Sequence, residues 1–339
     1  MDSPAPFWLI SRARGWCVHT PILSDRQRRW VALRATAALP RPLRVAARER
    51  LLARHEFGKA RRAALLIIGH PKSGNTWLRT MLSRLYHVRH DLPAEVVVKS
   101  DELARAHPGA PHLFASNGHY SYERAVGRAL AVGAPPSPLR RKPVVFLARH
   151  PCDIAVSWYL QFTKRQSPMK RELITCGLTQ PVDHRTVSCW EFVNHGALGL
   201  PALIDYLNTW IDNVAQLERA IVVRYEDLRS EPVRELRRIV DLFDPTFGDA
   251  DLQAAADFAS FDNLRRLEAS GFFQRGGLAL QTPGDPRARK VRRGRIHGYR
   301  DDFPTEQIAQ LDALVAARLS PSLGYDLLPD AGPREVVGS

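Results

Sequence analysis

The sequence has few cysteines and no long apolar run, and each shortage argues against a class of protein. Four cysteines occur in 339 residues, too far apart to form a C-x-x-C pair. This spacing predicts neither a structural zinc site nor a disulfide framework, and it is typical of a reducing cytoplasm. The longest apolar run near the N-terminus, residues 63–69, is about a third of the ~20 residues that a membrane span requires. No secretory signal is recognisable before it, so we expect a cytoplasmic globular protein.

Acidic residues are scarce relative to basic ones, and the imbalance is concentrated near the N-terminus. Lysine and arginine number 49 against 35 acids, giving a net charge of +14. Residues 1–62 hold 14 basic and 4 acidic side chains and thus carry +10. Such a field attracts polyanions, and Trp8, Trp16 and Trp30 lie among the arginines. Residues 1–62 are therefore interpreted either as a peripheral contact with an anionic inner membrane face or as a solvated arginine-rich helix pair.

Beyond residue 62, short apolar runs alternate with helical periodicity. Buried strands are predicted at residues 64–68, 144–148 and 221–225, with further strands at 95–99 and 113–116. Helices are predicted at residues 76–86, 232–243 and 306–319, and over most of 190–217 with an interruption near 196–201. Residues 164–185 are predicted to be irregular. The alternation favours an α/β fold with a central parallel sheet flanked by helices. We expect one domain over residues 63–328, a basic helical N-terminal extension over 1–62 and a disordered tail over 329–339.

One loop between a predicted strand and a predicted helix has the composition of an anion site. Residues 69–77 read GHPKSGNTW. Backbone N–H groups at such a helix start, together with the helix dipole, attract a phosphate. Gly74 permits close backbone approach, Ser73 and Thr76 offer hydroxyl donors, and Lys72 adds a full charge. The loop is not the G-x-x-x-x-G-K-[ST] pattern of nucleoside triphosphatases, because its lysine precedes the glycine.

Two segments resemble sulfotransferases that use 3′-phosphoadenylyl sulfate (PAPS). Residues 71–77, PKSGNTW, resemble that family's 5′-phosphosulfate-binding loop, and residues 149–159, RHPCDIAVSWY, resemble its R-x-P-x-D-x-x-x-S segment. The resemblance implies a P-loop kinase-like α/β fold with PAPS as co-substrate and no metal. It also implies that Arg149 and Ser157 hold the 3′-phosphate, which suits the planar guanidinium fork. The loop residues implied to bind the co-substrate are Lys72, Ser73, Gly74, Asn75, Thr76 and Trp77.

Three shorter matches extend the resemblance towards the C-terminus. Residues 225–228, YEDL, resemble the family's Y-E-D-[LM] strand end. The resemblance implies that Tyr225 helps enclose the adenine and that Trp77 stacks on it, while the two acids after Tyr225 serve structure. Ser260 and Phe261 resemble a T-S-F adenine edge, with alanine in place of the threonine. Residues 292–294, RRG, resemble an R-K-G clamp on the 3′-phosphate, which implies that Arg292, Arg293 and Gly294 bind the co-substrate.

The transfer step requires a base that removes the acceptor's hydroxyl proton, and histidine titrates in the right range. In the family this histidine follows a short strand in a K-[ST]-H pattern. Here the corresponding strand ends LFAS at residues 113–116 and is followed by NGHY, so His119 is the predicted base. Asn117 and Gly118 then stand at the lysine and hydroxyl positions. His112, which precedes the strand, is the alternative.

The predicted reaction is in-line transfer of the sulfuryl group of PAPS to an acceptor hydroxyl, with release of 3′,5′-ADP. Lys72 would stabilise charge on the bridging oxygen, as a fixed donor to the leaving group. Trp158 and Phe162 suggest an apolar wall, and the acceptor is expected to be a lipid, a phenolic or a natural-product alcohol. The alternatives are a P-loop phosphotransferase, which lacks its Walker lysine here, and a non-enzymatic basic protein that binds membranes or nucleic acid. Nucleic acid is disfavoured because no recognition module is present.

Overall fold

The centre of the molecule is a four-stranded parallel sheet. The computed structural model describes residues 23–94, 102–273 and 295–325. Its strands are β1 (Leu65–Ile68), β2 (Leu113–Ser116), β3 (Val144–Ala148) and β4 (Ala220–Arg224), in the order β2-β1-β3-β4. All three pairings are parallel, with Ile68 beside both Ser116 and Phe146. The carboxyl ends of the strands therefore meet at one edge, and the order reverses between β1 and β3, where open α/β sheets bind ligands.

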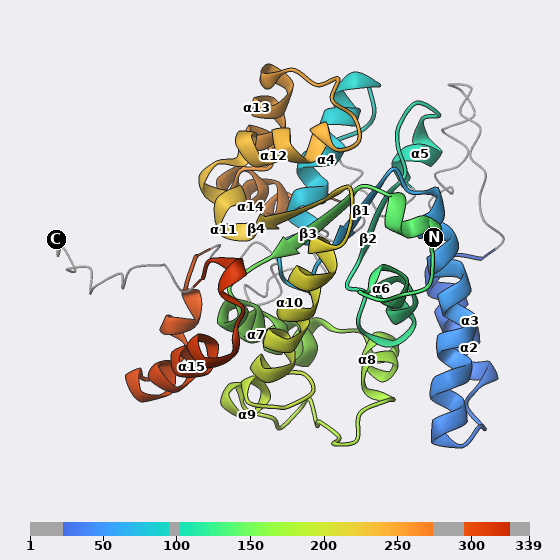
Figure 1. Ribbon diagram of the computed structural model, residues 1–339, viewed down its shortest axis with the longest axis vertical. Coiled ribbons are helices and arrows are strands. Elements are labelled where there is room, and N and C mark those ends of the chain that lie inside the picture. Colours follow the sequence, from blue (N-terminus) through green and yellow to red (C-terminus); the bar gives the residue numbers. More distant parts are fainter. Residues whose placement is uncertain (1–22, 95–101, 274–294, 326–339) are drawn as a thin grey trace, which may run out of the picture.

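Helices cover both faces of the sheet, which explains the unbroken apolar runs in β1 and β3 (Figure 1). One face buries Leu65, Ile67 and Val145, and the other buries Leu66 and Phe146. The first face is covered by α4 (Asn75–Arg89), α11 (Tyr225–Ser230), α12 (Pro232–Asp241), α13 (Asp249–Phe258) and α14 (Phe261–Ala269). The second is covered by α3 (Arg41–Arg62), α6 (Arg124–Leu130) and α10 (Leu200–Ala215). The predicted α/β fold with a flanked parallel sheet is confirmed.

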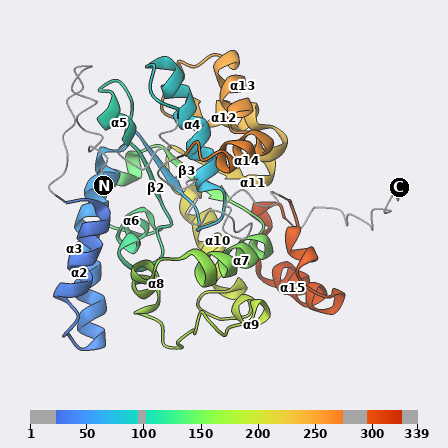
Figure 2. The same cartoon turned by 180° about the vertical axis from the view of Figure 1, so that it is seen from behind.

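A further group of helices lies beyond the carboxyl edge of the sheet, below it in Figure 1 and again in Figure 2. It comprises α7 (Pro151–Leu160), which continues into a π-helical turn, η4 (Gln161–Arg165), then α8 (Pro168–Thr175), α9 (Cys189–Val193) and α15 (Thr305–Arg318). Short elements complete the described chain: α5 (Glu102–Ala106), η2 (Ser121–Glu123), η3 (Pro138–Arg141), η6 (Gly298–Asp301) and η7 (Pro321–Leu323). Helix α8 corrects the prediction that residues 164–185 are irregular. The reason is local, since Ser167 caps its N-terminus and Pro168 opens it.

The N-terminal basic region is helical where the structure describes it, and it packs against the rest of the chain. Helix α2 (Asp25–Ala35) starts at a capping box formed by Ser24 and Gln27, and α3 begins just after Pro40. The buried guanidinium of Arg48 in α3 donates to Thr36 Oγ1 (3.0 Å) and to Glu172 Oε1 of α8 (2.7 Å). Leu52 and Ala32 join Tyr122 and Leu173 in one buried cluster. The two helices are therefore anchored to η2 and α8.

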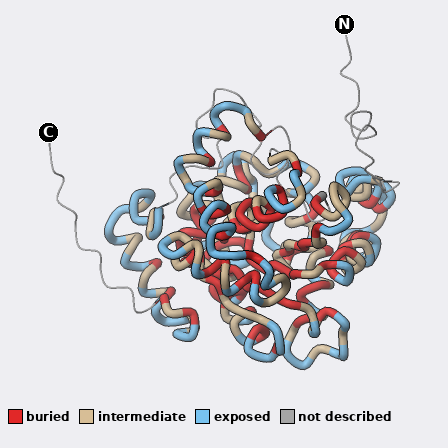
Figure 3. Tube along the Cα trace, turned by 90° about the horizontal axis from the view of Figure 1, so that it is seen from above, coloured by how far each residue is buried: buried red, intermediate tan, exposed pale blue. Residues whose placement is uncertain are grey.

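Burial follows this layering. All residues of β1 and β3 are buried, and Figure 3 shows buried residues in the interior and exposed ones on the periphery. In the described part of the chain, no helix combines the length and apolarity needed to cross a bilayer. Several predictions concern residues outside the described ranges: the strand at 95–99, the clamp at 292–294, the tail at 329–339 and the tryptophans before residue 23.

Candidate active site

A pocket of about 420 Å³ runs along the carboxyl edge of the sheet and receives residues that follow all four strands. Lys72 follows β1, Asn117 follows β2, Arg149 follows β3 and Tyr225 follows β4, and all four line it. The predicted site residues that line it are Lys72, Gly74, Asn75, Thr76, Trp77, Arg149, Ser157, Tyr225 and Phe261. Four segments that are far apart in the sequence thus contribute to one pocket.

The loop between β1 and α4 has the backbone geometry of a phosphate cradle. Lys72 and Gly74 both adopt positive φ, 83° and 105°, a conformation that is costly for lysine and ordinary for glycine. A Cβ on Gly74 would lie 2.8 Å from Cδ2 of Tyr225, so no larger residue fits there. Helix α4 starts without a side-chain cap, which leaves its first N–H groups for a ligand. Ser73 is fully buried beneath the loop, and its Oγ has no hydrogen-bond partner among the described residues.

Arg149 lies directly against this loop. Its Nη1 donates to the carbonyl oxygen of Lys72 (3.1 Å), and its guanidinium carbon lies 4.4 Å from the ring centroid of Tyr225. Asp153, one helical turn later, approaches Nη2 at 3.5 Å. Nε of Arg149 is buried and has no hydrogen-bond partner in the described part of the chain. A planar cation held in this way is suited to a phosphate beside the loop.

Aromatic side chains form the wall next to Arg149. The indole Nε1 of Trp77 donates to the carbonyl oxygen of Ala259 (2.7 Å), and its ring lies 5.4 Å from that of Tyr225. Phe261 also lines the pocket, with the Arg229 guanidinium 5.5 Å from its ring centroid. Ser260, by contrast, is exposed and is not part of the lining. The wall offers flat apolar surface of the kind on which a base stacks.

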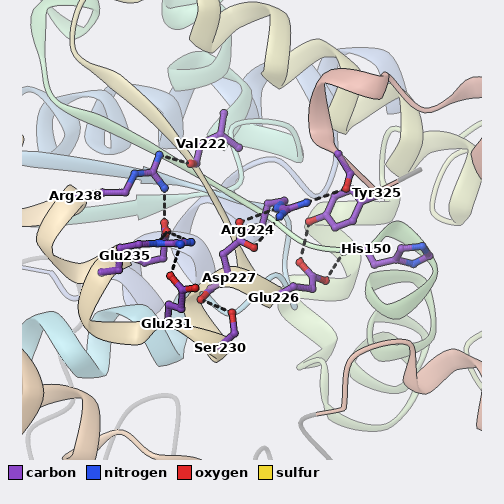
Figure 4. A network of polar contacts seen from close by, with 12 residues as sticks. His150, Val222, Arg224, Glu226, Asp227, Ser230, Glu231, Glu235, Arg238 and Tyr325 are labelled. Atoms are coloured by element: carbon purple, nitrogen blue, oxygen red, sulfur yellow. Dashed lines mark hydrogen bonds and ion pairs between the residues drawn. The ribbon is translucent and has the colours of Figure 1, made fainter. Parts of the chain in front are cut away.

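The two acids after Tyr225 serve structure, as expected, and Figure 4 shows their contacts. Glu226 accepts hydrogen bonds from the His150 backbone N–H (3.0 Å) and the Tyr325 hydroxyl (3.0 Å), and burial raises the pKa of its carboxyl. Asp227 accepts two hydrogen bonds from Arg224, both 2.7 Å long. These contacts join the ends of β3 and β4 to the turn before residue 326.

Asp153 links α7 to the segment before η6. It lies in the first turn of α7. Its carboxylate accepts hydrogen bonds from the backbone N–H groups of His297 (3.0 Å) and Tyr299 (3.1 Å). Asp153 therefore fastens the segment that follows residues 292–294 to the wall that carries Arg149.

The two histidines considered as base lie outside the pocket lining. The ring of His119 packs edge-on against Tyr120 and Tyr206, with centroids 5.0 and 5.6 Å apart, and burial followed by the charge of Arg124 lowers its pKa. His112 precedes β2, and its carbonyl oxygen accepts from Ala64 just before β1. His112 is thus at the amino edge of the sheet, opposite the pocket.

Several lining residues escaped sequence reasoning. Some follow the end of β2, and others belong to η4 or α8. They include Asn117, Tyr120, Glu123, Gln161, Arg165, Lys170 and Leu173. Their only sequence signal is proximity to the β2 strand end or to α7, because no motif marks them. Of the aromatics predicted for an apolar wall, Trp158 lines the pocket whereas Phe162 is fully buried behind it.

Comparison with known proteins identifies the family. The model of the sulfotransferase domain matches residues 62–322. Cytosolic sulfotransferase 13 of Arabidopsis thaliana is 22% identical over 275 residues, covering 77% of this chain and 78% of the relative. Cytosolic sulfotransferase 10 of the same plant is 20% identical over 282 residues, covering 76% and 78%.

Solved structures with some similarity to this chain were also found. A mouse sulfotransferase complexed with PAP is 16% identical with a TM-score of 0.48, covering 75% of this chain and 83% of its own. A retinol dehydratase in complex with androsterone and PAP is 14% identical with a TM-score of 0.48, covering 80% and 82%. On the strength of the family match, which spans most of its length, the chain belongs to the sulfotransferase domain family. The predicted family and enzyme class are confirmed, and the protein is a sulfotransferase.

Proposed function

We propose that this sulfotransferase moves the sulfuryl group of PAPS to the hydroxyl of an acceptor and releases 3′,5′-ADP. The observation that carries the proposal is the contact between Arg149 and Lys72, which places two cations at adjacent strand ends in one pocket. PAPS has phosphates at both ends of its adenosine, so two separate cationic points are what it requires. The PAP-bound sulfotransferase from mouse is consistent with this co-substrate.

The residues present fit such a nucleotide. Gly74 lets the loop lie against the ring of Tyr225, where a Cβ would come within 2.8 Å of it. The buried Ser73 Oγ and Arg149 Nε are polar atoms without hydrogen-bond partners among the described residues. We assign the 5′ end to the loop of Lys72–Thr76, and the 3′-phosphate to Arg149 and Ser157 together with Arg292, Arg293 and Gly294. The adenine would lie among Trp77, Tyr225 and Phe261, with Ser260 at its edge.

Lys72 is the group proposed to act on the leaving oxygen. In sulfuryl transfer negative charge develops on the oxygen that bridges sulfur and the 5′-phosphate. A preorganised ammonium beside that oxygen stabilises the transition state more than the ground state. The hydrogen bond from Arg149 to the Lys72 carbonyl oxygen fixes the backbone that carries this ammonium. No residue of this mechanism requires a metal ion.

The remainder of the pocket is proposed to receive the acceptor. Tyr120, Trp158, Leu160, Leu173 and Ile174 supply apolar surface there. Such a lining suits a lipid, a phenolic or a natural-product alcohol, with the hydroxyl directed towards Lys72. The amphipathic lining also includes polar and charged groups, which would orient the acceptor's hydroxyl.

The experiment that tests the function uses labelled PAPS. Full-length protein is incubated with [³⁵S]PAPS and a cellular extract of lipids and metabolites, and the labelled products are separated and identified. We expect label in an organic sulfate ester and stoichiometric 3′,5′-ADP. Boiled protein and PAPS alone are the controls. Release of inorganic sulfate only, or no stabilisation of the protein by 3′,5′-ADP in a thermal melt, would contradict the proposal.

We also propose that the protein works in the cytoplasm and touches an anionic membrane through residues 1–62. Support comes from the outer faces of α2 and α3, where Trp30, Leu43 and Leu51 are exposed among arginines. Apolar side chains within a cationic face are typical of helices that bind the membrane surface. Sedimentation with vesicles containing phosphatidylserine, compared with pure phosphatidylcholine vesicles, tests this contact. Equal or absent binding to the two vesicle types would contradict it.

A further inference from the structure

The strand order determines from which side an acceptor reaches the sulfuryl group. Arg149 and Tyr225 follow β3 and β4, whereas Lys72 follows β1 and thus lies between them and the end of β2. If the nucleotide lies over β3 and β4 with its 5′ end at Lys72, the attacking oxygen must come from the β2 side, since in-line transfer places attacking and leaving oxygens on opposite sides of sulfur. This step rests on the proposed function.

A carboxylate is held at that position. Glu123, in η2, lines the pocket and accepts hydrogen bonds at Oε2 from Ser116 Oγ (2.9 Å) and from the Asn117 backbone N–H (2.8 Å). Ser116 is the last residue of β2, and its carbonyl oxygen accepts from the Gly69 N–H of the phosphate loop (3.1 Å). Oε1 of Glu123 makes no hydrogen bond with a described residue, so it is available to a ligand. The contacts to Oε2 fix the orientation of the carboxylate.

Asn117 and Tyr120, which also line the pocket on the β2 side, are already engaged in hydrogen bonds. Asn117 Oδ1 accepts from the backbone N–H groups of His119 (2.8 Å) and Tyr120 (2.7 Å). The Tyr120 hydroxyl is 2.6 Å from His70 Nε2, and Nδ1 of His70 is 2.8 Å from the Pro71 carbonyl oxygen. A carbonyl only accepts, so Nδ1 donates and Nε2 accepts the tyrosine proton. Burial lowers the pKa of His70 to about 3, so this pair does not take up a proton near neutral pH.

The other carboxylates of the lining belong to the Arg149 side. Asp153 is paired with Arg149 and binds the backbone of His297 and Tyr299. The backbone N–H of Asp302 donates to the carbonyl oxygen of Tyr299 (3.0 Å), which places Asp302 in the same wall. Among the described lining residues, Glu123 is therefore the carboxylate on the acceptor's side of Lys72.

We propose that Glu123 is the catalytic base of the transfer. The acceptor's O–H bond breaks as its oxygen forms a bond to sulfur, and the proton passes to Oε1 of Glu123. The bond between sulfur and the bridging oxygen breaks at the same time, and its electron pair leaves with 3′,5′-ADP. Glu123 then returns the proton to solvent. His119 takes no part in this step because its ring packs outside the pocket lining.

The test compares two variants in the [³⁵S]PAPS assay with the same extract as acceptor source. Glu123→Gln keeps the size of the side chain and an oxygen that accepts from Ser116 and Asn117, but it does not act as a base. We expect its transfer rate to fall by about 10²-fold or more, the usual contribution of a general base. His119→Asn is the matched variant and is expected to stay near the wild-type rate. Thermal stabilisation by 3′,5′-ADP should be unchanged in both.

A second measurement separates catalysis from support of the fold. Glu123→Ala is assayed with added formate, which offers a carboxylate, and with added acetamide, which accepts the same hydrogen bonds but no proton. We expect rescue by formate alone. Wild-type turnover by Glu123→Gln, loss of turnover confined to His119→Asn, or equal rescue by acetamide would overturn the assignment. A wild-type protein that transfers no label would instead count against the proposed function.

Discussion

The two sides of the pocket are built in different ways. The side that faces β3 and β4 consists of residues from compact segments, namely the loop at residues 71–77, Arg149 with Ser157, and Tyr225. The β2 side takes single residues from η2, the end of α7, η4 and α8, for example Glu123, Gln161 and Leu173. The first side is thus defined by local backbone geometry, and the second by how separate short elements pack.

The difference agrees with the proposed division of the pocket between the co-substrate and the acceptor. A nucleotide with fixed phosphates requires a fixed cradle, and strand ends joined to helix starts provide one. The β2 side is not held by the sheet alone. Its elements η2 and α8 pack against α2 and α3 through Arg48 and the cluster around Leu52. These N-terminal helices end at residue 62, where the match to the family model begins.

Among substitutions that compare the two sides of the pocket, the largest effect on kcat is expected at Lys72. Lys72→Ala should lower kcat by about 10²- to 10³-fold, or roughly 3–4 kcal/mol, because a fixed donor to the leaving oxygen is lost. Binding of 3′,5′-ADP should weaken much less, since Arg149 and the aromatic wall remain. Steady-state rates with [³⁵S]PAPS, together with calorimetric titration of 3′,5′-ADP, measure the two effects separately.

Lys164→Ala is the matched control for that experiment. Lys164 is exposed in η4 and does not line the pocket, so its removal lowers the net charge equally but should leave kcat unchanged. Similar losses in both variants would mean that general positive charge, and not the position of Lys72, supports turnover. In that case the position of Lys72 on one side of the pocket would not be what supports catalysis.

A smaller effect is expected at Leu52, the buried member of two neighbouring leucines in α3. Leu52 is 5% exposed and packs with Tyr122 and Leu173, whereas Leu51 is 56% exposed on the outer face. Leu52→Ala should lower the free energy of unfolding by about 2 kcal/mol through the cavity it leaves. It should also raise KM for the acceptor more than KM for PAPS, because the wall of the β2 side loosens.

Leu51→Ala serves as the control within the same helix. Its free energy of unfolding should change by less than about 0.5 kcal/mol, as for most surface substitutions. Urea unfolding followed by circular dichroism measures both variants, and the [³⁵S]PAPS assay gives both KM values. Should Leu52→Ala alter neither stability nor the acceptor's KM, α3 would have no role in supporting the pocket.

Much of the fold was predictable because its signals are local. Unbroken apolar runs predict β1, β3 and β4. Gly74 marks the turn after β1, because its φ of 105° is a conformation that glycine adopts easily and other residues rarely do. Helix α8 was missed although Ser167 and Pro168 are a regular helix start, since the surrounding residues lack a strong apolar period. Strand β4 ends at Arg224, and Tyr225 already opens α11, which is one residue earlier than predicted.

The proposed proton acceptor illustrates what local patterns do not reveal. A histidine after a short strand predicts His119 as the base, whereas the packing leads us to propose Glu123. Gly118 adopts φ 64°, with Trp210 packed so closely that a Cβ would lie 2.6 Å from it. The turn at this glycine precedes a histidine ring packed on Tyr120 and Tyr206, whereas Glu123, four residues later, lines the pocket. Side-chain direction after a tight turn depends on such packing and not on the order of residues.

The sequence by itself determined the family, the parallel sheet and the strand-to-helix loop that we propose as the anion cradle, because each depends on a few adjacent residues whose backbone preferences are strong. Only the tertiary structure decided which groups share the β2 side of the pocket, and that the basic N-terminal helices support it. Those contacts join residues as far apart as Arg48 and Glu172. Burial and hydrogen bonding over such separations arise only when the helices pack onto the sheet.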